Sequence, residues 1–272
     1  LKNRFSSLKK AERESVQNLG QIEHKLNGKL IDVLDKLGDD LFMELTGNNP
    51  IDQDRMNIED YKRNESRLNA AQRAIEGLRG YIDEAKQAAE LDGIEIDAVP
   101  IFYKWRATKV GRLMQEGAFT PQSDKIIREM ITATNRAIDL KNEDSVDLAW
   151  LAIAQSLGEK VERDDHQQII NKVKKEMKRN GKYSKALTVL RKAVKGKKLD
   201  KRDKQKILDV IKEAVPNKGD RTAKMLHALT TVVEMELAQK EGADTFNMRL
   251  SLEADGVTDG PVNAIINMAS GK

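Results

Sequence analysis

The 272-residue sequence contains no cysteine, only 5 prolines, and aromatic residues at 4%. The absence of cysteine excludes disulfide bonds and thiolate metal sites. No stretch approaches the run of about 20 apolar residues that a membrane-spanning helix needs. Charged residues make up 34% of the chain, which is typical of a helix-rich, strongly solvated protein. We therefore expect a predominantly α fold with a small antiparallel β element.

Two common kinds of functional motif are also missing. The three histidines, His24, His166 and His227, include no pair four residues apart, so we expect solvated or core positions rather than a zinc site. No phosphate-binding loop of the form Gly-x-x-x-x-Gly-Lys-Ser/Thr occurs.

Apolar residues recur at helical spacing along most of the chain. The pattern predicts one long helix over residues 3–46, with Gly20 and Gly28 as the places where it would break, and a second over 58–91. Residues 93–118 have the character of a hairpin. Further helices are predicted near 122–141, 144–157, 163–180, 182–195, 202–215 and 220–240.

The alternating pattern of a half-buried strand appears near the C-terminal end, over residues 247–254. Asp255 stands where this strand would end, Gly256 and Gly260 relax the turn, and Pro261 suits the first position of a new helix. A carboxylate at such a strand end can hold a divalent metal against a phosphate. A plain corner, in which Asp255 or Asp259 caps the helix, is the alternative.

A second unusual segment, residues 101–113, mixes aromatic residues with cations. Phe102, Tyr103 and Trp105 lie among Lys104, Arg106, Lys109 and Arg112. This mixture suits phosphates and stacked bases. Taken alone, the segment is equally well explained as a basic hairpin.

Together the two segments resemble the single-subunit RNA polymerase family of phages and mitochondria, specifically its virion-packaged branch. That family has an Asp-or-Thr-x-x-Gly-Arg motif followed by motif A, an Asp-Gly-x-x-x-Gly turn after a strand. Thr108, Gly111 and Arg112 fill the first motif, and Asp255, Gly256 and Gly260 fill the second, 143 residues after Arg112. The resemblance covers roughly residues 97–272.

The resemblance implies two-metal nucleotidyl transfer in a DNA-directed RNA polymerase. Asp255 would be one of two aspartates that bind catalytic Mg²⁺ ions, and the Gly256 carbonyl would be a further ligand. Arg112 would hold the template or the RNA–DNA hybrid, while Thr108 and Gly111 would shape the turn and Arg106 and Lys109 would add phosphate contacts. DNA template, RNA–DNA hybrid and nucleoside triphosphates are the implied partners, in a virion or the host cytoplasm.

The chain departs from the family pattern in one respect. It ends 17 residues after Asp255, whereas the fingers helix and the second catalytic aspartate of the family lie further downstream. We therefore expect half an active site, two ions only in the complete enzyme, and no synthesis by this chain alone. By the same analogy, residues 1–92 would form a thumb-like helical hairpin, with a plain helical arm as the alternative. Residues 93–272 would form a partial palm with a basic helical insertion at about 160–245.

Positive charge is concentrated between residues 171 and 206. This segment contains 16 Lys or Arg against 3 Asp or Glu, a balance of +13 in a chain whose formal net charge is +4. Such a density predicts contact with nucleic-acid backbone without base specificity, through residues that include Lys174, Lys175, Lys178 and Arg179. A solvated helix face is the alternative.

The sequence thus favours part of a virion-type phage RNA polymerase. The rival from another class is a non-catalytic nucleic-acid-binding or virion structural protein, ejected with the genome, in which the Asp255 turn is only a corner.

Overall fold

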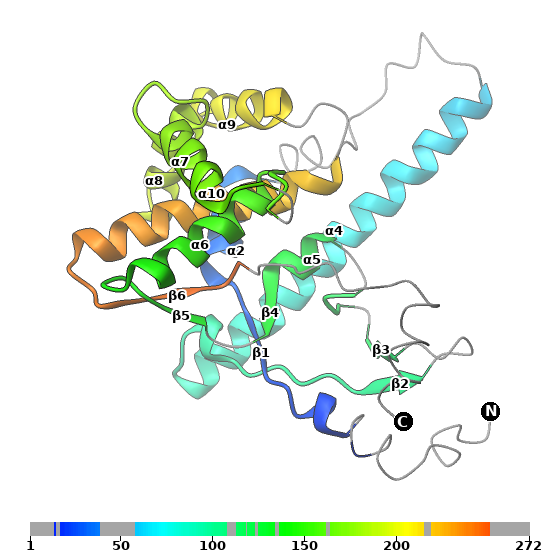
Figure 1. Cartoon of the computed structure of the whole chain (residues 1–272). Helices are drawn as coiled ribbons and strands as arrows, with labels where there is room; N and C mark the ends of the chain where they lie inside the picture. Colours follow the sequence, from blue (N-terminus) through cyan, green and yellow to red (C-terminus); the bar gives the residue numbers. More distant parts are fainter. Residues whose placement is uncertain are drawn as a thin grey trace, which may run out of the picture.

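The computed structural model describes residue 14 and residues 17–38, 58–107, 113–117, 119–122, 125–133, 136–161, 164–214 and 219–250. Helices dominate these ranges, and the strands form three two-stranded antiparallel sheets (Figure 1). The predicted fold class, mainly α with a small antiparallel β element, is confirmed.

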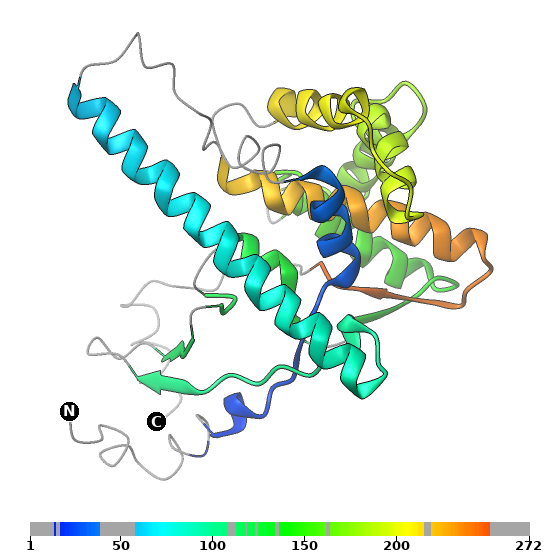
Figure 2. The ribbon, with the colours of Figure 1, turned by 180° about the vertical axis from the view of Figure 1, so that it is seen from behind.

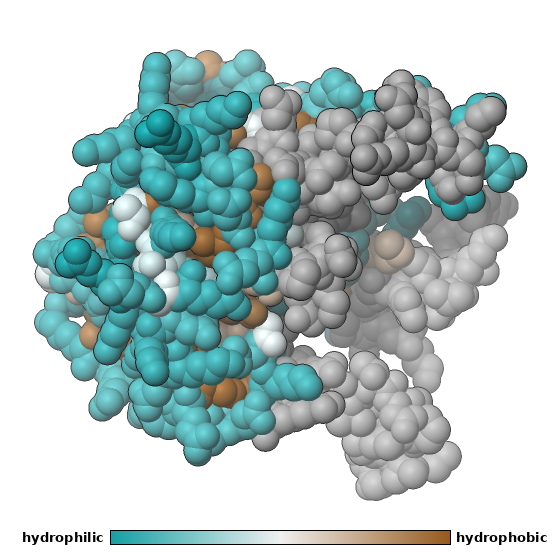
Figure 3. Space-filling view, turned by 90° about the horizontal axis from the view of Figure 1, so that it is seen from above, coloured by the Kyte–Doolittle hydropathy of each residue, from teal (hydrophilic) through white to brown (hydrophobic). Residues whose placement is uncertain are grey.

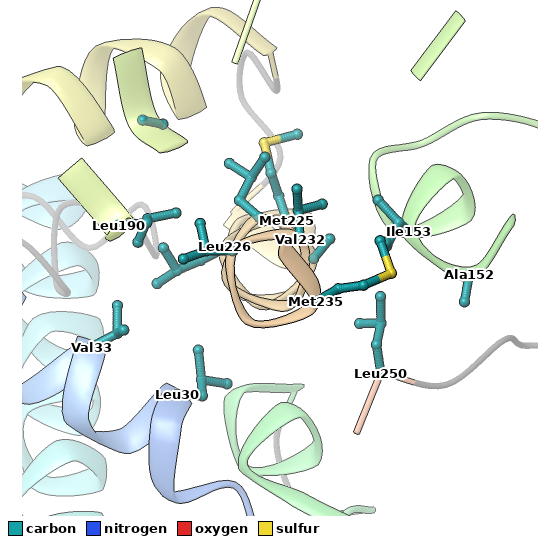
Figure 4. Packing of buried hydrophobic residues seen from close by; sticks show 14 of the residues in the cluster. Leu30, Val33, Ala152, Ile153, Leu190, Met225, Leu226, Val232, Met235 and Leu250 are labelled. Carbon is teal, nitrogen blue, oxygen red and sulfur yellow. The ribbon is translucent and has the colours of Figure 1, made fainter. Parts of the chain in front are cut away.

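The helical body is built around α10 (Gly219–Lys240), which is buried along most of its length. The helices α6 (Glu143–Ser156), α8 (Ser184–Val194) and α5 (Lys125–Met130) pack around it, and α7 (His166–Met177) and α9 (Lys201–Ala214) complete the layer. Figure 4 shows α10 in the centre, with Leu226 pointing toward Leu190 and Met235 pointing toward Ile153 and Leu250. The predicted helices from residue 144 to residue 240 are confirmed.

Local signals explain where these helices begin. The Asn142 side chain accepts a hydrogen bond from Ser145 N at the start of α6, and Asp165 does the same for Gln168 N at the start of α7. These are N-caps, which satisfy amide groups that have no partner within the helix. The apolar residues of α7, α8 and α9 then fall on one face, which is why the sequence pattern identified these helices correctly.

The prediction of one long helix over 3–46, with breaks near Gly20 or Gly28, is confirmed in part: residues 17–20 are helical and a new helix begins at Gly28, but the residues between them are not helical. Residues 24–26 form a strand, β1 (His24–Leu26), and a new helix, α2 (Gly28–Leu37), follows directly. Asn27 accepts a hydrogen bond from Leu30 N and so caps α2, which makes the helix begin there. β1 pairs with β4 (Ile131–Ala133), with His24 opposite Ala133. This pairing outweighs the helical spacing of the apolar residues.

The prediction of a helix near 122–141 is also wrong beyond residue 130. β4 follows α5 directly, and β5 (Arg136–Asp139) comes next. The β-branched residues Ile131 and Thr132 favour an extended backbone. β5 pairs with β6 (Thr245–Met248), with Arg136 opposite Met248. β6 begins two residues before the strand predicted over 247–254, and residues 251–254 lie outside the described part.

The second predicted helix is confirmed as α4 (Ile58–Asp92), which has 35 residues and projects from the body (Figures 1 and 2). Its C-terminal half is fastened to α2, because Lys86 and Arg79 form ion pairs with Asp35 at 3.1 and 3.5 Å. The Tyr81 ring also stacks on Phe119 at 5.2 Å. A short 3₁₀ helix, η3 (Ile96–Ala98), follows α4.

The hairpin predicted over residues 93–118 is confirmed only in its second half, by β2 (Trp105–Ala107) and β3 (Leu113–Gln115), because residues 96–98 form η3 instead. Trp105 lies opposite Gln115, and Ala107 lies opposite Leu113. Figure 1 shows this hairpin away from the helical body, at the end of a long extended segment.

Candidate nucleic-acid interface

The β2–β3 hairpin is held in place by two of its three aromatic residues. Tyr103 is buried and its hydroxyl donates to the Phe119 carbonyl at 3.0 Å, while Trp105 Nε1 donates to the Leu19 carbonyl at 3.1 Å. Burial raises the pKa of Tyr103, so its hydroxyl remains a donor. Tyr103 is therefore not available for stacking on bases, and Trp105 is half-buried. Phe102, by contrast, is 57% exposed.

Most of the first sequence motif lies in the connection between β2 and β3. Thr108, Lys109, Gly111 and Arg112 lie outside the described residues, and their roles stay predictions. Arg106 is the exception, because it is described, lies on β2 and is exposed. A phosphate contact by Arg106 is compatible with this position.

The strand β1 supports the segments that lead to both motifs. His24 and Ile101 exchange two backbone hydrogen bonds of 2.8 Å, and the His24 ring meets Tyr103 edge-on at 5.0 Å. Arg249, which follows β6, donates to the Leu26 carbonyl of β1 and to the Asp97 carboxylate of η3. The chain entering the hairpin and the chain approaching Asp255 are thus bound to the same three-residue strand. Asp255 and Gly256 themselves lie outside the described residues.

A half-buried carboxyl group, that of Glu234, lies close to Arg249 and Asp97. Burial raises the pKa of Glu234 to about 7, while the positive charges of Arg249 and Lys29 act in the opposite direction and Asp97 adds to the rise. The folded protein therefore binds a proton at Glu234 between pH 4.5 and 7, where the unfolded chain has released it.

Stability should consequently fall as pH rises through that window. The Glu234→Gln variant removes the titrating group, so its free energy of unfolding should fall less than that of the parent between pH 5 and 8. Urea unfolding at both pH values measures the difference. Identical pH dependence in the two proteins would show that folding does not raise the pKa of Glu234.

The basic segment 171–206 contains several cations that are already paired within the protein. Arg191 makes a bidentate pair with Glu236 at 2.8 Å, and Lys192 contacts the buried Asp203 at 3.0 Å. Hydrogen bonding to Lys192 lowers the pKa of Asp203. Lys172 pairs with Glu159 at 2.7 Å. These cations hold neighbouring elements together, as the connection from α8 to α10 through Arg191 and Glu236 shows.

The four cations that the sequence analysis selected differ in their environments. Lys174 contacts Asp147 at 3.3 Å and lies 5.7 Å from the centre of the Trp150 ring, so a phosphate would compete with these contacts. Lys175, Lys178 and Arg179 are exposed, at the C-terminal end of α7 and in the turn after it. Within the described ranges, these three side chains form no ion pair. They are the cations of the four best placed for phosphate.

The helical body presents a mainly hydrophilic surface over the described residues in Figure 3. A second group of exposed cations lies in the turn between α8 and α9, at Lys195, Lys197 and Lys198. The two groups are therefore at opposite ends of α8. The sequence predicted one continuous basic segment, whereas in the fold α8, which buries one of its faces, lies between the two groups along the chain.

A buried polar network joins three elements of the core. His227 of α10 contacts Glu129 Oε2 through Nδ1 at 2.7 Å and Asn27 Nδ2 through Nε2 at 2.9 Å. Because Asn27 Oδ1 accepts from Leu30 N, its amide group donates to Nε2, and Nδ1 carries the proton donated to Glu129. His24 is also buried, and the prediction of core histidines is confirmed for these two. The sequence did not indicate that His227 has a carboxylate partner.

The described residues contain no group of three or more His, Cys, Asp or Glu side chains able to hold a metal ion. The Mg²⁺ ligands expected from the sequence, Asp255 and Gly256, are not among them. Of the helices in the described part, none is long and apolar enough to cross a membrane.

Comparisons with known proteins concern a single family. Residues 11–131 match the family model described as a virion DNA-directed RNA polymerase domain, and residues 148–236 match the model of the plug insertion of virion DNA-directed RNA polymerase. The chain is also 28% identical over 252 residues to the virion DNA-directed RNA polymerase of Enterobacteria phage N4. This alignment covers 92% of the chain and 7% of the relative.

The chain therefore belongs to the virion-packaged phage RNA polymerase family, as the resemblance in the sequence implied. The plug-insertion match spans α7, α8 and α9, and overlaps the range 160–245 that the sequence analysis assigned to a basic helical insertion. The division into a thumb-like part and a partial palm stays a prediction.

Proposed function

We propose that this chain forms part of the catalytic region of a DNA-directed RNA polymerase and supplies Asp255 to a two-metal site. The supporting observation is that β1 holds both motif-bearing segments, the β2–β3 hairpin and the approach to Asp255, in a chain of this family. Family membership favours this role over that of a virion structural protein with an ordinary corner at Asp255.

The donor chemistry fits Mg²⁺, which prefers carboxylate and carbonyl oxygens such as those of Asp255 and Gly256. Two such ions, when bound in the complete enzyme, activate the attacking 3′ hydroxyl and neutralise the departing pyrophosphate. Asp255 and Gly256 would hold an ion, and Arg112 would fix the template or hybrid beside it. These 272 residues alone are expected not to synthesise RNA, because they supply only one of the two aspartates that the family mechanism requires.

The partners follow from the same proposal. They are the DNA template, the RNA–DNA hybrid, nucleoside triphosphates and the remainder of the polymerase, and the protein would be packaged in the virion and act in the host cytoplasm. The relative named above supports virion association, since it is a virion enzyme.

Arg112 provides a test of the hairpin's role. In the complete polymerase, Arg112→Ala should lower the elongation rate about tenfold or more, because it removes a charge-assisted phosphate contact. The melting temperature should change little. Arg112→Lys is the matched variant and should retain part of the rate. If Arg112→Ala instead unfolds the protein without a specific defect in elongation, Arg112 is a structural ion-pair residue.

The exposed cations after α7 provide a second test, which the chain itself permits. The triple variant Lys175→Gln, Lys178→Gln, Arg179→Gln should weaken binding to unrelated DNA sequences about equally and flatten the salt dependence, because fewer counterions are released. Fluorescence anisotropy over a salt titration measures both quantities.

A matched control removes three exposed positive charges elsewhere: Lys62→Gln, Lys141→Gln and Lys240→Gln. This control should keep nearly the parent's salt slope. Equal slopes for the parent and both triple variants would show that the residues after α7 form a solvated face.

A further inference from the structure

The extended segment before and within β2 has two different faces. Ile101, Tyr103 and Trp105 point toward the protein and are buried or half-buried. Phe102, Lys104 and Arg106 alternate with them, and all three are exposed. Side chains of an extended strand alternate between its two faces, so these three share the outer face at intervals of about 6.6 Å.

β3 extends this outer face. Met114 lies directly opposite Arg106 in the antiparallel register and is 39% exposed, so the two side chains share a face. Glu116 N donates a hydrogen bond to the Lys104 carbonyl at 2.7 Å, which holds the backbone of Lys104 against β3. The surface formed by Phe102, Lys104, Arg106 and Met114 is called the hairpin outer face below.

The anchoring of the opposite face keeps these residues exposed. Tyr103 and Trp105 are each held by a hydrogen bond to a backbone carbonyl, and the Tyr81–Phe119 stack supports the Tyr103 contact. Turning the segment over would expose both anchors. Within the described residues, the side chains of Phe102, Lys104 and Arg106 have no hydrogen-bond or ion-pair partner.

An exposed aromatic ring followed by cations at every second position is suited to single-stranded nucleic acid. Bases stack on aromatic rings whatever their sequence, and Lys and Arg neutralise the phosphates. Phe, Met and Arg are also enriched at protein–protein interfaces, so failure of the strand-binding test below would favour a protein partner.

We propose that the hairpin outer face binds a single strand of nucleic acid, with one base stacked on Phe102 and neighbouring phosphates at Lys104 and Arg106. The identity of the strand rests on the proposed polymerase function, because that proposal assigns Arg112, which follows β2 in the sequence, to the template or hybrid. Binding of a single strand to this surface does not require the proposed polymerase function.

The experiment compares two strands of equal length and phosphate number, a thymidine oligonucleotide and its abasic counterpart, by fluorescence anisotropy with the 272-residue chain. The parent should bind the thymidine strand about fivefold or more tightly than the abasic strand, which corresponds to one stacked base. Phe102→Leu retains an apolar side chain without an aromatic face and should bring the ratio close to one. Phe102→Trp should preserve it.

Two further variants separate stacking from charge. Lys104→Gln with Arg106→Gln should weaken both strands to a similar extent and leave the ratio unchanged. Leu91→Ala alters a side chain that is 88% exposed on α4 and should change neither affinity. A ratio that Phe102→Leu leaves at the parent's value would overturn the proposal, as would equal affinity of the parent for both strands.

These outcomes are distinct from a failure of the proposed function. If Asp255→Asn leaves RNA synthesis by the complete polymerase intact, the catalytic assignment fails, while the strand ratio of the 272-residue chain is unaffected. If the ratio fails and Asp255→Asn abolishes synthesis, only the hairpin outer face has been misassigned.

Discussion

Asp255→Asn in the complete polymerase is expected to lower RNA synthesis by about a thousandfold or more while leaving template affinity nearly unchanged. The substitution removes the negative charge that would hold Mg²⁺, and each tenfold loss of rate corresponds to about 1.4 kcal/mol of transition-state stabilisation. Phosphate contacts made by Lys and Arg side chains remain. A template-dependent synthesis assay, paired with a template-binding titration, measures the two effects separately.

Asp259→Asn is the matched control for this prediction. Asp259 lies in the same predicted turn and undergoes the same chemical change, but it does not occupy the strand-end position of the motif. Its variant should retain most of the synthesis rate. Near-normal synthesis by Asp255→Asn, or equal losses in the two variants, would support the alternative in which this turn is only a corner.

The second large effect concerns stability. His227→Leu in the 272-residue chain should lower the free energy of unfolding by about 3–5 kcal/mol, because it leaves the buried Glu129 carboxylate without its hydrogen-bonded partner. The Asn27 amide also loses its acceptor, although its oxygen still caps α2. Urea unfolding followed by circular dichroism measures the change.

A double variant tests whether the loss arises from the unpaired carboxylate. Adding Glu129→Met to His227→Leu removes the buried charge and should recover a substantial part of the stability, so the two changes will not add. A loss below about 1 kcal/mol for His227→Leu would contradict the buried network. So would strict additivity of the two substitutions.

Sequence periodicity predicted the helical body well, because α7, α8 and α9 each bury one apolar face. It failed where pairing with a distant segment decided the structure. Leu26 of β1 lies at helical spacing from Ile22 and Leu30. Nevertheless β1 pairs with β4, which lies more than a hundred residues away in the sequence. No local pattern contains that information.

Prediction of the candidate site from the sequence was limited in the same way. The density of cations between residues 171 and 206 is evident in the sequence, but the pairing of Arg191 with Glu236 depends on how α8 packs against α10. Conversely, the sequence does show that Phe102 alternates with Tyr103 and Trp105, so an extended segment would place Phe102 on the opposite face from the other two. Treating the three aromatics as one group concealed it.

The central claim is that Asp255 holds a catalytic metal beside the hairpin that carries Arg112. Replacing Mg²⁺ with Fe²⁺ in the complete polymerase, and adding peroxide, generates hydroxyl radicals that cleave polypeptide near the metal. Cleavage of this chain is predicted close to residue 255 and within residues 108–112, and both cuts should disappear in Asp255→Asn. Cleavage at neither position in the active enzyme, or an unchanged pattern in the variant, would contradict the account.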